Sequence, residues 1–178
     1  KIVFFMSRDN KRVPLFIHYK KGIKLDGNNP AMLRGYGGFN IGIEPHYIGP
    51  IAAFINRGGI FAEVGNRGGN EYGESWHQDG MQFKKQNSFN DFIDAAEYLV
   101  KEKYTNPQKL AADGRSNGGL LMGAITTQRP DLFKVTFPAV GVMDMLKFHK
   151  FTIGYGWSSD YGSSEQSKEM FEYLKGYS

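Results

Sequence analysis

The sequence predicts an α/β fold in which a mostly parallel β-sheet carries helices on both faces. Three observations predict this class. Two strand-like segments at the N-terminus form a hairpin pattern, and strand-like and helix-like segments then alternate along the chain. Ile60–Val64 is almost entirely apolar, which is typical of a strand buried on both faces. In such sheets the chemistry lies beyond the carboxyl ends of the strands.

Local patterns of apolar and turn residues give the individual elements. Between Asn90 and Lys103 apolar residues recur at helical spacing, and Ser88 or Asn90 is the expected cap. The hairpin strands are expected at Ile2–Ser7 and Val13–Lys20, the other strands at Ala31–Tyr36, Ile60–Val64, Lys109–Asp113 and Val135–Val140, the other helices at Ile51–Asn56, Asn117–Gln128 and Glu165–Lys175, and a loop at Gly65–Gly80.

Composition indicates one globular domain and excludes several kinds of site. The chain has 178 residues, of which 40% are hydrophobic, enough for a single core. It contains no cysteine, which excludes a disulfide scaffold, cysteine-ligated zinc and a cysteine nucleophile. The net charge of +4 comes from scattered basic residues, so no nucleic-acid partner is expected. No apolar run reaches the roughly 18 residues of a membrane span, and no membrane partner is expected.

The most specific motif is Gly114-Arg115-Ser116-Asn117-Gly118-Gly119, between a predicted strand and a predicted helix. This context is that of a nucleophile elbow, the tight turn that holds a serine at the edge of an α/β-hydrolase sheet. Glycines let the strand and helix backbones approach closely. The motif predicts Ser116 as the nucleophile and the Asn117 N–H as an oxyanion donor. The alternative is a glycine-rich turn with a capping serine.

A second glycine-rich motif, Gly35–Asn40, follows the third predicted strand. Acyl transfer needs a second donor at the oxyanion, and in this fold the loop after the third strand supplies it. Backbone N–H groups and the Tyr36 hydroxyl are the candidates. The alternative is a glycine turn beside a core tyrosine.

No histidine in the chain is predicted to be the general base. His18 lies in a predicted strand, His46 and His77 in predicted loops, and His149 after the sixth strand, with no metal-ligand spacing among them. In an α/β-hydrolase the order is serine, acid, then histidine, late in the chain. The acid and base are therefore expected beyond Ser178, in a sheet that this chain leaves truncated before its last strands.

Five segments together carry a family resemblance. They are Gly35–Asn40, Asn66–Gly73, Ser116–Leu121, Gln128–Phe133 and Val140–Lys150. In order and spacing they resemble the catalytic domain of the prolyl oligopeptidases, family S9 of the serine peptidases, over essentially the whole chain. Without the resemblance, Asn66–Gly73 is interpreted as a structural loop, because it lacks phosphate-loop spacing.

The resemblance implies a serine endopeptidase that cleaves short peptides on the carboxyl side of proline, without metal or cofactor. It implies that Tyr36 completes the oxyanion hole, that Trp157 stacks on the substrate proline, and that the other pocket walls are Phe39, Val142 and Tyr161. It further implies a β-propeller upstream of Lys1 and a triad Asp and His downstream of Ser178. Residues 1–178 alone are then expected to be inactive. A cytoplasmic location is expected, with the periplasm left open.

Two alternatives stay open on the sequence. Arg115 stands where prolyl oligopeptidases usually have glycine and where the oligopeptidase B type often has arginine. One alternative is therefore another hydrolase of this fold: oligopeptidase B, an acylaminoacyl or dipeptidyl peptidase, or an esterase. The other is a non-catalytic, hydrolase-like binding module.

Overall fold

The computed structural model describes residues 1–44 and 46–178, and a six-stranded sheet organises them. The strands, in chain order, are β1 (Ile2–Met6), β2 (Arg12–His18), β3 (Ala31–Gly35), β4 (Ile60–Val64), β5 (Leu110–Arg115) and β6 (Val135–Ala139). Their spatial order is β1-β2-β4-β3-β5-β6. β1, β2 and β4 pair antiparallel, whereas β4, β3, β5 and β6 pair parallel. This confirms the predicted leading hairpin and mostly parallel sheet.

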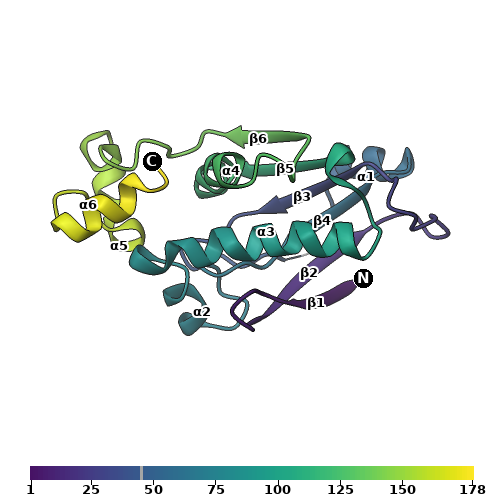
Figure 1. Ribbon diagram of the computed structural model, residues 1–178, viewed down its shortest axis with the longest axis horizontal. Helices are drawn as coiled ribbons and strands as arrows, with labels where there is room; N and C mark the ends of the chain where they lie inside the picture. The colour runs from purple at the N-terminus through teal and green to yellow at the C-terminus, as the bar shows by residue number, and fades with distance from the viewer. Residues whose placement is uncertain (45) are drawn as a thin grey trace.

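Helices lie on both faces of the sheet, as predicted. On one face α3 (Lys85–Lys101) and α4 (Asn117–Gln128) cover a core that includes Leu33, Ala62 and Phe92. On the other face α1 (Gly49–Asn56) lies near Phe61, where the two line a small cavity. Side chains alternate across a strand, so Phe61 and Ala62 point to opposite faces. The last helices, α5 (Ser158–Tyr161) and α6 (Lys168–Lys175), gather at the end to which β3 and β6 point (Figure 1).

The start of α3 differs from the prediction. The helix begins at Lys85 rather than Asn90, and its N-cap is Lys84, so Ser88 and Asn90 lie inside the helix. The first turn was not predicted from apolar spacing, because Lys85 and Ser88 are polar residues that are nevertheless buried in the structure. Their polar atoms bond to the backbone of a neighbouring loop instead of facing water.

Other boundaries differ where the pattern is short or irregular. The predicted loop 65–80 contains the helix α2 (Glu74–Gln78), which therefore carries His77. α6 begins at Lys168, three residues later than expected, because the Ser167 side chain accepts the Met170 N–H and caps it there. Short 3₁₀ turns occupy Gln82–Lys84, Pro107–Lys109, Phe148–Lys150 and Gly154–Trp157.

Candidate active site

Ser116 occupies a strained turn between β5 and α4. Its backbone has φ 58° and ψ −115°, a conformation that residues with a side chain rarely adopt. The Ser116 N–H donates to the Ala139 carbonyl oxygen at 2.9 Å, which ties the turn to the end of β6. Strain of this kind persists only where the surroundings enforce it, and it is the geometry of a nucleophile elbow.

Three glycines of the motif leave no room for a side chain. A Cβ on Gly114 would lie 2.2 Å from the Gly118 carbonyl oxygen, and one on Gly118 would lie 2.6 Å from the Gly35 oxygen. A Cβ on Gly119 would lie 2.6 Å from the Gly141 Cα. The close approach predicted from the motif is therefore present, and it brings β3, β5 and α4 together around Ser116.

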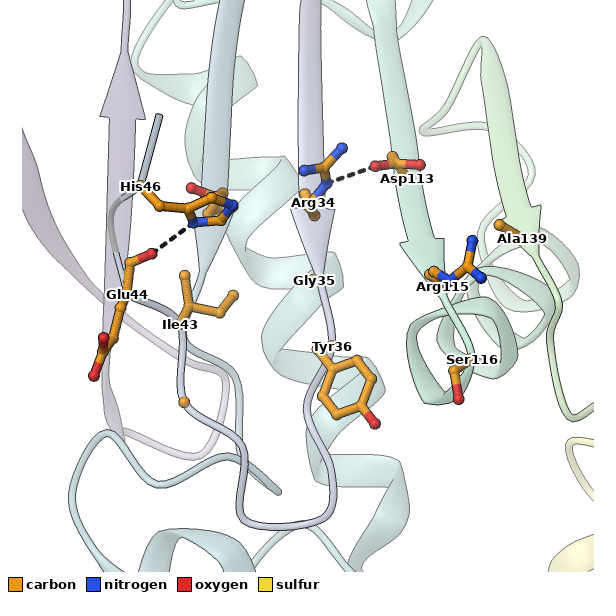
Figure 2. A pocket seen from close by; sticks show the side chains of 12 residues that line it. Arg34, Gly35, Tyr36, Ile43, Glu44, His46, Asp113, Arg115, Ser116 and Ala139 are labelled. Atoms are coloured by element: carbon orange, nitrogen blue, oxygen red, sulfur yellow. Dashed lines mark hydrogen bonds and ion pairs between the residues drawn. The ribbon is translucent and has the colours of Figure 1, made fainter. Parts of the chain in front are cut away.

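The Tyr36 side chain points from the end of β3 into the space beside Ser116 (Figure 2). Burial raises the pKa of the Tyr36 phenol, and the interaction of its hydroxyl with Ser116 partly offsets that rise. The phenol therefore stays protonated and remains a donor at neutral pH. Asn117 is the first residue of α4, so its N–H belongs to the group of helix N–H donors without an intrahelical acceptor.

The Asn117 side chain also has a structural role, which the sequence did not indicate. Its Nδ2 donates to the Tyr36 carbonyl oxygen at 2.6 Å, and its Oδ1 accepts the Tyr161 hydroxyl at 2.9 Å. Asn117 is 1% exposed. One buried amide thus links the residue after the nucleophile, the candidate oxyanion tyrosine and a candidate pocket residue.

The four candidate pocket residues form two groups. Phe39 and Tyr161 contact edge to face, with ring centroids 5.3 Å apart, and Tyr161 is 1% exposed. Val142 and Trp157 instead line a separate cavity of about 330 Å³ together with Phe151. None of the four lines the cavity that contains Ser116.

That cavity, of about 720 Å³, is lined by Tyr36, Ser116 and several charged side chains (Figure 2). Arg34 Nε donates to Asp113 Oδ2 at 2.6 Å, and Glu63 lies opposite Arg34 in the register of β3 and β4. Burial raises the pKa of the Glu63 carboxyl. Sequence reasoning missed these residues, although single charges in neighbouring apolar strands were a usable signal.

In the part of the chain that the structure describes, none of the four histidines is placed to act as the base for Ser116. His46 lines the same cavity, but its Nδ1 lies 3.0 Å from the Glu44 carbonyl oxygen, across the cavity from the serine (Figure 2). His77 Nε2 lies 2.7 Å from Asp160, and His149 Nε2 lies 3.5 Å from Glu165. His18 lies beside Glu63, on β2.

Residues 1–44 and 46–178 hold no group of three or more histidine, aspartate or glutamate residues placed to bind a metal ion. No helix in this part of the chain has both the length and the apolar character needed to cross a bilayer.

The model of the prolyl oligopeptidase family matches residues 45–178. The chain belongs to the prolyl oligopeptidase family. The sequence is 56% identical over 176 residues to a prolyl endopeptidase of Elizabethkingia meningoseptica, covering 99% of this chain and 25% of that protein. It is 52% identical over 181 residues to a prolyl endopeptidase of Dictyostelium discoideum, covering 100% of this chain and 24% of that protein.

Solved structures of the family show the same fold. A prolyl endopeptidase superposes with a TM-score of 0.98 at 46% identity, over 100% of this chain and 26% of that one. A post-proline cleaving enzyme from Rickettsia typhi superposes with a TM-score of 0.96 at 35% identity, over 99% and 26%. The predicted α/β-hydrolase fold is therefore confirmed, and the chain spans about a quarter of the length of its prolyl oligopeptidase relatives.

Proposed function

We propose that the protein containing this chain is a serine peptidase that hydrolyses short peptides on the carboxyl side of proline. The observation that carries the proposal is the elbow: Ser116 in a strained turn, with the Tyr36 hydroxyl beside it and the Asn117 N–H at a helix N-terminus. Relatives at 56% and 52% identity are named prolyl endopeptidases, which supports the substrate class.

In the proposed reaction Ser116 attacks the carbonyl carbon of the substrate proline. The developing oxyanion accepts hydrogen bonds from the Tyr36 hydroxyl and the Asn117 N–H. The peptide C–N bond then breaks, and the amine leaves with the proton that the base took from Ser116, so that the acyl group stays on Ser116 as an ester. Water hydrolyses this ester and restores the serine hydroxyl. Trp157, Phe39, Val142 and Tyr161 are the proposed walls of the proline pocket, because flat aromatic surfaces suit a rigid apolar ring.

The serine also needs a base and an orienting acid. We place both outside residues 1–178, because none of the four histidines contacts Ser116 in the part of the chain that the structure describes. Residues 1–178 alone are then expected to show no useful turnover, since a serine hydroxyl without a base is a poor nucleophile.

Cleavage of matched peptides by the full-length protein tests the proposal. The peptides differ only at the residue before the scissile bond, which is proline, alanine, lysine or arginine. We expect cleavage after proline, and we expect Ser116→Ala to lower kcat/KM by roughly 10⁴-fold or more. Ser75→Ala, at an exposed serine of α2, is the control and is expected to leave the rate unchanged.

Other outcomes would point to the alternatives. Preferred cleavage after lysine or arginine would indicate the oligopeptidase B type and would give Arg115 a role in selectivity. A folded, full-length protein that cleaves none of the peptides would contradict the proposal and favour a binding module.

A further inference from the structure

The turn that follows Tyr36 is held by two buried charged side chains from distant parts of the chain. Lys85 Nζ, at the start of α3, donates to the Gly37 carbonyl oxygen at 2.9 Å. Asp160 Oδ1, on α5, accepts the Phe39 N–H at 3.2 Å. Lys85 is 1% exposed and Asp160 is 2% exposed. The two side chains therefore hold the turn by hydrogen bonds at both of its ends, Gly37 and Phe39.

These two charges also face each other. Lys85 Nζ lies 3.7 Å from Asp160 Oδ2, and His77 Nε2 lies 2.7 Å from Asp160 Oδ1. Burial lowers the pKa of Lys85 to about 8, and the attraction of Asp160 opposes that fall. A buried ion pair is weak evidence for a purely stabilising role, because its desolvation offsets much of the attraction.

The turn needs such support because its backbone is strained. Gly37 has φ 63°, and Phe39, which is not glycine, has φ 55°. A non-glycine residue in this region costs free energy and is kept there by its surroundings. The Ser88 hydroxyl donates a second hydrogen bond to the Gly37 carbonyl oxygen, at 3.0 Å. The restraints thus converge on the peptide groups immediately after Tyr36.

We propose that Lys85 and Asp160 are positioning residues that set the place of the Tyr36 hydroxyl beside Ser116. Asp160 extends the effect to the pocket, because the next residue, Tyr161, contacts Phe39 and donates to the Asn117 side chain. The inference rests on the proposed function and deepens it. Both side chains are buried and neither lines the cavity of Ser116, so each acts through the turn that carries the oxyanion donor.

The test uses Lys85→Met in the full-length protein, with Lys84→Met as the matched control. Lys84 is the neighbouring lysine, and it forms a surface ion pair with Asp79 at 2.8 Å. We expect Lys85→Met to lower kcat on a proline peptide at least tenfold, with a smaller effect on KM. Lys84→Met is expected to stay within about twofold of the native rate. Equal rates for the two variants would overturn the proposal.

A double-mutant cycle separates positioning from general damage. If Lys85 acts through Tyr36, Lys85→Met should lower kcat by less than about threefold once Tyr36→Phe is present. An undiminished, additive loss would show that Lys85 acts elsewhere and would refute the proposal.

If Lys85→Met does not fold, the paired change Lys85→Met with Asp160→Asn replaces it. This variant removes both charges together, so no buried charge is left without a partner, and the amide oxygen can still accept the Phe39 N–H. Native kcat in this folded variant would overturn the proposal. A loss of kcat that disappears in the Tyr36→Phe background supports it.

Failure of this inference is distinguishable from failure of the proposed function. If the native protein does not cleave the peptide, or if Tyr36→Phe has no effect on kcat, the proposed function or the oxyanion role fails, and the inference fails with it. If Tyr36→Phe is damaging and the Lys85 variants are not, only the inference fails.

Discussion

The elbow and the segment from Val140 to Trp157 are held in different ways. Around Ser116 the backbones of β3, β5 and α4 touch, and three glycines leave no space for a Cβ. In the second segment side chains reach the surface: Val140 is 67%, Ile153 70% and Tyr155 79% exposed. The candidate catalytic residues are thus fixed by close backbone packing, whereas the candidate pocket residue Trp157 ends a 3₁₀ turn and Val142 lies in an irregular stretch directly after Gly141.

A mutation should therefore act differently in the two regions. A change at the elbow alters backbone geometry, so it should affect folding and kcat together. A change of an exposed or half-buried side chain in the second segment, away from the tightly packed Gly141 and Gly154, alters one contact surface, so it should affect substrate selectivity and leave folding intact. Substitutions in each region test that separation.

After loss of the nucleophile itself, removal of the Tyr36 hydroxyl should have the largest effect on the chemical step. We expect Tyr36→Phe to lower kcat by about 10²- to 10³-fold with little change in KM, because the lost donor acts mainly in the transition state. Steady-state kinetics of the full-length protein measure this. Tyr47→Phe, at a tyrosine that is 85% exposed, is the control. An unchanged kcat would remove Tyr36 from the oxyanion role.

Crowding at the elbow should affect stability. A Cβ on Gly119 would lie 2.6 Å from the Gly141 Cα, so Gly119→Ala should lower the free energy of unfolding by about 2 kcal/mol. Gly156→Ala places its Cβ 4.0 Å from the nearest side chain and should change the stability by less than about 0.5 kcal/mol. Denaturant unfolding compares the two. Equal stability would mean that the elbow tolerates the extra atom.

In the second segment, loss of an aromatic ring should change selectivity alone. Trp157→Ala is expected to reduce the preference for proline over alanine by about tenfold, equivalent to ~1.4 kcal/mol, and to leave the melting temperature near the native value. Tyr155→Ala, at the more exposed neighbour, should leave the preference unchanged. The ratio of kcat/KM values on the two peptides gives the answer. An unaltered ratio would refute proline stacking by Trp157.

The smallest effect on stability is expected at the ion pair between Arg67 and Asp9, which lies away from Ser116. Arg67 follows β4 and bonds Asp9 and Asp91, and its hydrogen bonds lower the pKa of Asp9 to about 2 from 3.8. Because the folded-state pKa is depressed, the stabilisation is present above about pH 4 and disappears as the pH falls towards 2. Asp9→Asn should therefore lower stability slightly at pH 7 and much less at pH 2. Melting curves at both pH values test this, and an equal deficit at both would contradict it.

The elbow could be predicted from the sequence more completely than the segment from Val140 to Trp157. The strands follow from local apolar patterns, and the roles proposed for Ser116 and Asn117 at the start of α4 follow from a motif whose spacing the elbow itself dictates. The helix α2 and the turns between Phe148 and Trp157 have too few residues for a periodic signal. For Val142 and Trp157 only the family resemblance indicated a role.

The contacts that brace the site lay beyond sequence reasoning. Asn117 meets Tyr36 across 81 positions of the chain, and Asp160 meets Phe39 across 121. Lys85 was hidden because a buried lysine has the same appearance in a sequence as a solvated one. Such contacts depend on the assembled fold, which brings β3, α3, α4 and α5 together.

Labelling of the full-length protein with a fluorophosphonate probe, followed by peptide mapping, tests most directly whether Ser116 is the nucleophile. We expect rapid labelling at Ser116, no labelling in Ser116→Ala, and slower labelling in Tyr36→Phe. A folded protein that reacts at another serine, or at none, would contradict the assignment of Ser116 as the nucleophile.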